Sequence, residues 1–324
     1  MGAINSVLCS TLETPYMRKK LIFAQLRSTV LSAFLMEKKR IVFEDGGREI
    51  TNPLIVGRNP NIQSYSYYDE LPVQQTNEFT KIRYGFSRVA GTVIVSQQEE
   101  DENMGEQAVV KIVDAKLETL RISIKERFGR DYMYGLGAGK DPNGLGLLIP
   151  DDPTQGVVGG IDRATNAYWR TSSYQMNGSM TMANISRTFR GVFLDAKAAE
   201  EGKFDGIIVG RNIFDMYADF LESKSSLAAQ TTKALTGKAD FGFDELLYQG
   251  TRLMYDPNCP DDKAYFINTK YLRLHVMRHV NMKVAKLEAP WVMDASGSRI
   301  TWEGQLCLWK ADGTQAVLNN ATVN

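Results

Sequence analysis

The chain has 324 residues, of which 43% are hydrophobic, and its 38 Lys and Arg side chains balance 38 Asp and Glu side chains. A chain of this length and apolar content can bury a hydrophobic core, which excludes a disordered or fibrous protein. A formal net charge of zero excludes the overall positive field of a protein that coats nucleic acid.

The cysteines and the hydropathy give little sign of special chemistry or of a membrane. Cys9, Cys259 and Cys307 are far apart and form no Cys-x-x-Cys pair, so neither a zinc site nor a redox motif is expected. No apolar run is long enough to span a bilayer, and the first 15 residues lack the order of a signal peptide. We expect a soluble chain, made in the cytoplasm, with no membrane partner. Residues 1–6 match the loose myristoylation pattern, but so short a pattern often matches by chance.

An amphipathic helix, or helical arm, is predicted over residues 16–40. Apolar residues there recur mostly every three or four positions, from Met17 to Leu35. The Asp-Gly-Gly sequence at 45–47 interrupts this pattern and opens extended structure.

A long β-hairpin is predicted next. Ile82, Tyr84 and Phe86 alternate with polar or small residues, as in a strand with one covered face, and residues 50–56 are the expected partner strand. The polar, tyrosine-rich stretch between the two strands is too long for a tight turn. An isolated hairpin is marginally stable in water, so we expect it to lie on another surface such as a neighbouring subunit. The expected contact residues are Tyr65, Tyr67, Tyr68, Asp69 and Glu70.

A buried strand over 92–96 and a long helix over about 104–130 follow. Acidic residues at 99–102 favour a helix start, because carboxylates complement the positive end of the helix dipole. At 1.5 Å per residue the helix would be roughly 40 Å long, which suits a structural strut. Its apolar stripe consists of Val109, Val113, Leu117, Leu120, Ile124 and Phe128.

The middle of the chain reads as mixed α and β. Glycines at 135–146 end the strut region, and a second unit is expected to begin near residue 151. A helix over 184–201 should present one apolar face, made by Ile185, Phe189, Val192, Phe193 and Ala196. A short buried strand at 206–210 should lead into a further helix, and residues 223–243 lack periodicity, which predicts a loop.

The last part of the chain reads as mainly extended. Strands are predicted over 265–277, 280–287 and 300–309, with a turn at Asp312 and Gly313. The predicted fold class is therefore α+β.

A glycine-rich sequence at 135–140, Gly-Leu-Gly-Ala-Gly-Lys, resembles a phosphate-binding loop only superficially. Tyr134 stands where a Walker A loop needs its first glycine, and Asp141 stands where it needs Ser or Thr. Lys140 occupies the place of the third glycine of the dinucleotide pattern. We interpret the segment as a hinge or turn.

The candidate metal ligands fail in a similar way. His275 and His279 are four residues apart, but Val276 replaces the Glu of a metalloprotease motif and the flanking residues alternate like a strand. We interpret both as surface or half-buried histidines. An EF-hand loop starting at Asp101 would have Glu106 at its sixth position and Ile112 at its twelfth, which excludes it. We expect no catalytic, cofactor-binding or metal-binding residues.

Three segments carry a sequence resemblance. The first is Gly47-Arg48-Glu49-Ile50 before Pro53-Leu54. The second is Gly159, Gly160, Ile161, Asp162 and Arg163, followed by an aromatic residue and Trp169-Arg170. The third is Asp256-Pro257-Asn258-Cys259-Pro260 before Tyr265-Phe266-Ile267-Asn268-Thr269. In their order and spacing, the three segments resemble the major capsid proteins of tailed bacteriophages, the Hong Kong 97 capsid fold family.

The resemblance implies a division of the chain into the parts of that family. These parts are an N-terminal arm at 1–44, an extended hairpin or E-loop at 45–90, a peripheral domain with the spine helix at 91–150, an axial domain at 151–249, and peripheral return strands and C-terminal strands at 250–324. In that family the hairpin overlays an adjacent subunit, and the axial domains meet at the centres of hexamers and pentamers.

The expected function is therefore a capsid subunit rather than an enzyme. The resemblance implies self-assembly into an icosahedral virion shell around double-stranded DNA in the bacterial host cytoplasm, without sequence-specific DNA binding. It also implies a separate scaffolding protein, a portal and optional decoration proteins as partners. Two alternatives stay open: an encapsulin-type compartment, which would hold cargo peptides and no DNA, and a cytosolic enzyme, which would be a monomer with a substrate-sized pocket.

Overall fold

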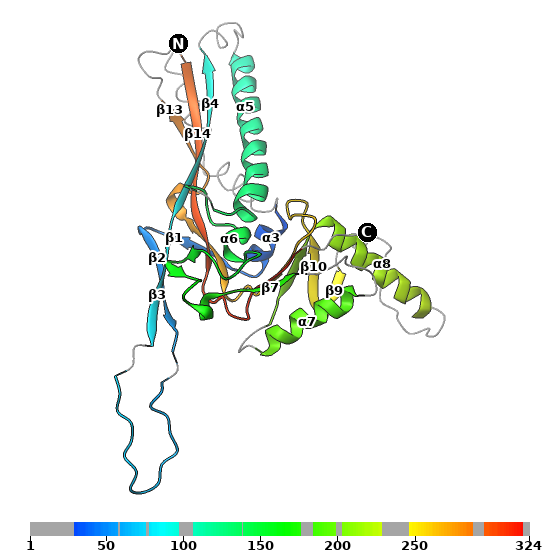
Figure 1. Cartoon of the computed structure of the whole chain (residues 1–324). Helices are drawn as coiled ribbons and strands as arrows, with labels where there is room; N and C mark the ends of the chain where they lie inside the picture. Colours follow the sequence, from blue (N-terminus) through cyan, green and yellow to red (C-terminus); the bar gives the residue numbers. More distant parts are fainter. Residues whose placement is uncertain are drawn as a thin grey trace.

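The computed structural model describes residues 29–57, 59–75, 78–96, 106–137, 139–175, 184–198, 203–228, 246–287 and 295–319. The molecule is elongated and has three parts around a central body (Figure 1). A trunk of strands and one long helix extends to one side, a two-stranded ribbon projects to the opposite side, and a lobe of helices and strands lies laterally. None of the helices in these ranges is long and apolar enough to cross a membrane.

The trunk is built on a five-stranded sheet within the described ranges. Its strands follow the order β1 (Ile41–Glu44), β12 (Leu272–Met277), β14 (Ala295–Leu308) and β13 (Lys283–Leu287), and β4 (Ser87–Ser96) pairs along β14. β1 is parallel to β12, and the other pairings are antiparallel.

The lobe is built on a six-stranded sheet. Its order is β7 (Ser172–Gln175), β15 (Ala316–Asn319), β11 (Ala264–Ile267), β8 (Gly206–Val209), β10 (Thr251–Tyr255) and β9 (Leu246–Tyr248). Side chains of its central strands alternate between two apolar clusters: Ile207 and Phe266 pack with the lobe helices, whereas Ile208 and Tyr265 pack with the central body. Both faces of this sheet are therefore covered, which explains why all four residues of β8 and of β11 are buried.

Two helices supply the outer cover of that sheet. Helix α7 (Ile185–Ala198) buries Ile185, Phe189, Val192, Phe193 and Ala196, which confirms the predicted apolar face. Helix α8 (Arg211–Ala228) follows β8, as expected, and adds Ile213, Met216 and Tyr217 to the same cluster.

The predicted strut is confirmed as α5 (Glu106–Arg127), which continues into a π-helical turn, Phe128–Met133. It lies along β4 (Figure 1). At the contact, a methyl group on Gly91 would lie 2.7 Å from Leu120 Cδ1, so a larger residue there would force the Leu120 side chain to shift. The short helix α6 (Leu145–Leu148) follows the glycine-rich segment, where Gly137 and Gly139 have positive φ angles, and the predicted turn is present.

Several predicted elements need correction. Most of the predicted helix at 16–40 lies outside the described residues, and only α3 (Val30–Glu37) is seen, with Leu31, Phe34 and Leu35 buried in the body. The strand predicted as buried at 92–96 is the end of the longer β4, and Ile94 is exposed, because α5 covers only one face. Residues 223–228 are helical rather than a loop, since an exposed helix needs only one apolar face.

The strand predicted over 265–277 is in fact two strands, β11 and β12, which belong to different sheets. The carboxamide of Asn268 accepts a hydrogen bond from the Lys270 backbone N–H at 3.0 Å, and this local turn divides the run. In consequence, the lobe sheet crosses the predicted domain boundary at residue 250: β8 precedes it, whereas β10, β11 and β15 follow it. The remaining domain limits stay predictions.

Candidate assembly interface

The projecting ribbon is the most distinctive surface of the molecule. Its inner half is the antiparallel pair β2 (Glu49–Ile55) and β3 (Phe79–Gly85), in a register that places Glu49 opposite Gly85 and Ile55 opposite Phe79. The alternation of side chains gives the pair two faces. Ile50, Ile82 and Tyr84 point into the body and are buried, whereas Thr51 and Arg83 lie on the exposed face. The predicted hairpin strands are thus confirmed.

The base of the ribbon is fixed to the trunk sheet. The Tyr84 hydroxyl donates a hydrogen bond to the Leu308 carbonyl at 3.0 Å and accepts one from the Leu308 N–H at 3.3 Å. Its ring packs edge-on against Trp309, with the ring centres 5.9 Å apart. Burial raises the pKa of the Tyr84 phenol above its usual range, so this hydroxyl keeps its proton.

The segment that resembles the capsid family packs directly on this base. The Gly159 carbonyl accepts a hydrogen bond from the Arg83 N–H at 2.9 Å. Gly159 has a φ of 62°, and a Cβ there would lie 2.6 Å from Ile82 Cγ2. Gly160 also has a positive φ, 77°. The two glycines are therefore needed for conformation, and Gly159 also for contact with the ribbon.

Arg163 ties the same segment to the central body. It is 1% exposed and donates hydrogen bonds to the carbonyls of Leu147, Leu148 and Trp169. The first two of these carbonyls end α6, where a cation is favourable. Burial lowers the pKa of Arg163 to about 10, yet the guanidinium stays protonated at neutral pH.

The remaining residues of this segment complete the support. The Trp169 indole N–H donates to the Val158 carbonyl at 2.8 Å, and Trp169 is fully buried. Ile161 is buried in the central cluster. The Asp162 carboxylate accepts from the Ala164 N–H at 3.0 Å and shapes the turn. The segment acts as a structural brace for the ribbon base.

Beyond β2 and β3, the outer ribbon extends into solvent. It is held by hydrogen bonds across its two sides: Asn61 donates to the Gln74 carbonyl at 2.8 Å, and Gln63 donates to the Glu70 carbonyl at 2.9 Å. Asp69 accepts from the Ser66 N–H at 2.7 Å and closes the tip. The contacts are local, so they set the shape of the ribbon without covering its side chains.

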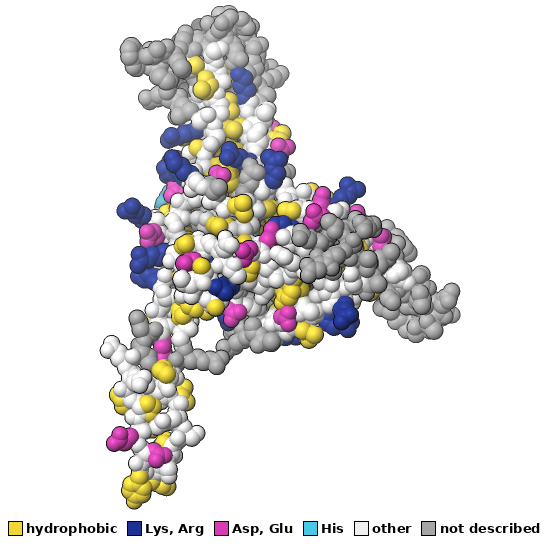
Figure 2. Space-filling view, in the orientation of Figure 1, with side chains coloured by type: hydrophobic (Ala, Val, Ile, Leu, Met, Phe, Trp, Pro, Cys, Tyr) yellow, Lys and Arg dark blue, Asp and Glu magenta, His cyan; other side chains and the backbone are white. Residues whose placement is uncertain are grey.

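The apolar side chains of the ribbon are exposed to a degree unusual in a soluble chain. Tyr67 and Tyr68 are each 99% exposed, and Val73 is 92% exposed. Figure 2 shows hydrophobic side chains along the ribbon and at its tip, with acidic side chains beside them. The other exposed members are Ile55, Ile62, Tyr65, Leu71 and Phe79. Of the predicted contact residues, Tyr65, Tyr67, Tyr68, Asp69 and Glu70 are all exposed in one chain; their contacts between subunits stay a prediction.

The predicted core residues of the strut differ in their environment. Phe128 is buried and packs edge-on against Trp302 at 4.9 Å between ring centres. Leu120 and Ile124 are partly buried against the central cluster, and Leu117 is also partly exposed. The side chains of Val109 and Val113 lie outside the part of the structure that is described.

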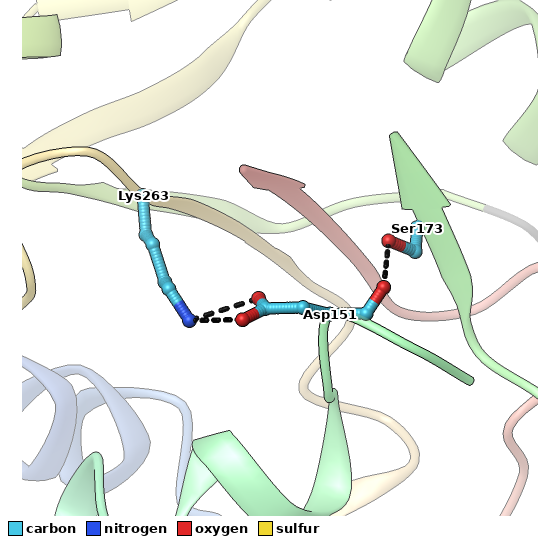
Figure 3. Close-up of polar contacts among 3 residues, drawn as sticks. All are labelled: Asp151, Ser173 and Lys263. Carbon is cyan, nitrogen blue, oxygen red and sulfur yellow. Dashed lines mark hydrogen bonds and ion pairs between the residues drawn. The ribbon is translucent and has the colours of Figure 1, made fainter. Parts of the chain in front are cut away.

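An ion pair that the sequence did not predict joins the lobe to the central body. Lys263, between β10 and β11, places Nζ 2.6 and 2.8 Å from the two carboxylate oxygens of Asp151 (Figure 3). On the other side of Asp151, the Ser173 hydroxyl of β7 donates to the Asp151 carbonyl. Both charged side chains are partly buried, so solvent and salt screen their attraction less than they would screen an ion pair on the open surface.

The residues that suggested chemistry are not brought together. Among the described residues, no group of three His, Cys, Asp or Glu side chains could hold a metal ion. His275 is buried on β12, with Nδ1 2.9 Å from Glu44 Oε1, whereas His279 is exposed in a short 3-10 turn, Arg278–Val280. The prediction of two surface or half-buried histidines was therefore wrong for His275.

Comparison with solved structures shows which known proteins share this architecture. The chain is similar to the capsid of cyanophage A-1(L), with a TM-score of 0.61 and 14% identity over 87% of this chain and 91% of that chain. It is also similar to the capsid of Myoviridae phage XM1, with a TM-score of 0.57 and 10% identity over 88% and 91% of the two chains. The capsid of the native GTA particle gives a TM-score of 0.54 and 10% identity over 89% and 90%.

No protein-family model and no curated protein sequence matches the chain. At this low identity the similarity establishes the fold, which is that of phage capsid proteins. The predicted α+β capsid fold is thereby confirmed.

Proposed function

We propose that this chain is the major capsid protein of a tailed bacteriophage. Copies of it would self-assemble as hexamers and pentamers into an icosahedral shell that encloses double-stranded DNA. The observation that carries the proposal is the ribbon: its base is fixed by Tyr84 and Gly159, and its outer part exposes apolar side chains, in a fold shared with phage capsids.

The energetics favour a neighbour over the ribbon. Fully burying one large apolar side chain is worth roughly 1.5–3 kcal/mol, so covering several of them would offset much of the cost of association. Each subunit of a closed shell is held by several neighbours, so individually weak contacts suffice. These considerations support the role in which the ribbon overlays an adjacent subunit.

The remaining assignments follow from the same proposal. Residues 45–90 would be the E-loop, α5 the spine helix, the trunk sheet the core of the peripheral domain, and the lobe the axial domain that meets its copies at the ring centre. The partners would be further copies of the chain, a separate scaffolding protein, a portal and optional decoration proteins. Shells would form in the host cytoplasm, and the chain would carry no catalytic site.

Electron microscopy tests this proposal. The chain would be expressed alone and together with a candidate scaffolding protein, and the products separated by sedimentation. Closed shells built of pentamers and hexamers are the expected result. Compact single molecules at high concentration in both conditions would contradict it. Shells that retain cargo peptides and neither portal nor DNA in infected cells would point to a compartment instead.

A further inference from the structure

A hollow of about 500 Å³ lies at the base of the ribbon and is rich in positive charge. Its lining includes Arg83 on β3, Arg88 at the start of β4, and Lys140 in the glycine-rich turn, against one acidic residue, Asp141. The failed phosphate-loop motif thus contributes a lysine to a site at the ribbon base.

Among the described residues, two of the three cations in this hollow have no counter-charge. Arg88 pairs with Glu303 at 3.0 Å, and Asp141 lies 3.8 Å from Arg127, so the hollow's single carboxylate already has a cation beside it. Across the described ranges, neither Arg83 nor Lys140 has an ionic partner, and both are exposed. The hollow therefore has a surplus of positive charge in the single chain.

Glycines keep the hollow open. Gly85, Gly137, Gly139 and Gly159 all line it. A Cβ on Gly85 or Gly139 would meet no atom within 4 Å, so the space in front of these backbones is unfilled. A side chain from another molecule can approach the backbone there.

The tip of the ribbon has the opposite charge. In the described part of 57–78 the charged residues are Asp69, Glu70 and Glu78, all acidic, and the one basic residue of the stretch, Arg58, lies outside that part. Asp69 and Glu70 stand next to the fully exposed Tyr67 and Tyr68. On the face seen in Figure 2, the outer ribbon carries acidic and hydrophobic side chains and no Lys or Arg.

The acidic tip points away from the basic hollow of its own chain. Fourteen positions separate Asp69 from Arg83, which corresponds to about 45 Å of extended chain. The ribbon projects straight away from the body (Figure 1). A protein partner for either charged surface is therefore more readily supplied by another copy than by the described part of the same chain.

We propose that the ribbon tip, through Asp69 and Glu70, binds the hollow formed by Arg83 and Lys140 at the ribbon base of a neighbouring copy. This inference rests on the proposed capsid function and specifies one contact within it. Because tip and hollow are different surfaces, the contact is head-to-tail, and repeating it generates a ring when the rotation closes. Complementary charge also determines which neighbouring copy the ribbon binds and where along that copy its tip lies.

Substitutions that reverse the charges of the tip and of the hollow test the contact. Three variants are compared with the natural chain in shell assembly with its scaffolding protein: D69K/E70K, R83E/K140E, and the combination of all four changes. Each double variant should raise the concentration needed for assembly about fivefold or more, because attraction becomes repulsion at exposed pairs. The combined variant should return to within about threefold of the natural chain, because the attraction is restored with reversed sign.

All four side chains are exposed, and the hydrogen bond from the Ser66 N–H that D69K removes lies within the exposed tip, so thermal unfolding of the isolated subunits should differ little among the variants. As an independent test, the variant D69C/R83C should form disulfide-linked multimers in assembled shells, seen as a ladder of bands on a non-reducing gel. The single variants D69C and R83C should not. Neither of the described natural cysteines competes, since Cys259 and Cys307 are buried.

The outcomes separate the two proposals. If the natural chain forms shells but both double variants assemble normally, or if the combined variant stays as defective as either one, the capsid role stands and the tip-to-hollow contact is wrong. If R83E/K140E assembles normally but its shells bind less added double-stranded DNA than shells of the natural chain, the hollow binds nucleic-acid phosphates instead. If the natural chain forms no shells, the capsid role fails and the contact fails with it.

Discussion

The phenol oxygen of Tyr84 is both a donor and an acceptor toward one residue, Leu308, and so joins the ribbon strand β3 to the trunk strand β14. The two residues are 224 positions apart in the chain. Tyr84 is 3% exposed, so water does not replace these hydrogen bonds. This one hydroxyl therefore helps to set the orientation of the ribbon relative to the trunk.

Removing that hydroxyl should destabilise the subunit. Y84F keeps the ring packed on Trp309 but leaves buried polar groups of Leu308 with one partner fewer, at a cost of about 1–3 kcal/mol. The free energy of unfolding from urea titration measures this cost. Y68F removes a hydroxyl from a tyrosine that is 99% exposed and should change stability by less than about 0.5 kcal/mol. Equal stability of Y84F and Y68F would show that the link to Leu308 contributes nothing.

Gly159 should tolerate no side chain. G159A combines a positive φ with a methyl group 2.6 Å from Ile82 Cγ2, so we expect a loss of about 2–4 kcal/mol in unfolding free energy. Gly139 provides the matched control, because its φ of 67° is similar but a methyl group there meets nothing within 4 Å. G139A should therefore cost only the conformational strain, about 1 kcal/mol. A G159A variant no less stable than G139A would mean that the ribbon base does not press on this segment.

Elements with a strong local pattern could be predicted from the sequence. The apolar steps of α5, the alternation of β3 and the apolar face of α7 are each carried by residues close together in the chain, and all three elements formed as expected. The exposed ribbon tip was also foreseen, because its mixed polar and aromatic composition suits neither a core nor a tight turn.

Long-range pairings could not be predicted in this way. Asp256 is fully buried and accepts hydrogen bonds from the Tyr134 hydroxyl at 2.7 Å and the Val30 N–H at 3.1 Å, two groups more than 100 residues away in sequence. The Lys263–Asp151 pair and the split between β11 and β12 depend on the tertiary arrangement in the same way. The basic hollow was missed because Arg83 and Lys140 become neighbours only when β3 packs beside the glycine-rich turn.

His275 should make the stability of the subunit depend on pH. Burial lowers its pKa below the ordinary 6.5, and nearby Arg273 acts in the same direction, although the hydrogen bond and charge of Glu44 oppose this shift. Its Nε2 is buried without a hydrogen-bond partner within the described structure, and its ring lies edge-on to Trp309. The folded chain thus favours the neutral imidazole.

The sign of the effect follows from proton binding. Below pH 6.5 the unfolded chain binds a proton at His275 more readily than the folded chain does. The contribution of His275 to stability is therefore fully present above pH 6.5. It is lost as the pH falls toward the lowered pKa of the folded state, by up to about 1.4 kcal/mol per pH unit. H275Q should flatten this part of the profile between pH 7 and 5. H279Q, at the exposed histidine, should leave the profile unchanged. Identical profiles for H275Q and the natural chain would refute the assignment.

The contact between α5 and β4 predicts a position-dependent effect on the same helix. L120D places a carboxylate where Leu120 packs over Gly91, so we expect a loss of about 2–4 kcal/mol and a lower melting temperature by circular dichroism. Ile122 is on the same helix but 51% exposed, and I122D should change the stability of the isolated subunit by less than about 1 kcal/mol. A folded L120D subunit as stable as I122D would argue against the strut's apolar face.

Shortening the ribbon should separate folding from assembly. Deletion of residues 58–76 removes the exposed tip but leaves the β2–β3 ladder, Tyr84 and Gly159 in place, so the unfolding free energy of the subunit should change by less than about 1 kcal/mol. The same subunit should fail to form stable shells with its scaffolding protein, because no apolar or acidic tip remains to reach a neighbour. Sedimentation and electron microscopy measure assembly, and circular dichroism with urea titration measures folding. Normal shells from this variant would show that assembly does not need the ribbon tip. An unfolded subunit would show that the tip stabilises its own chain. The exposure of Tyr67, Tyr68 and Val73 argues against that second outcome.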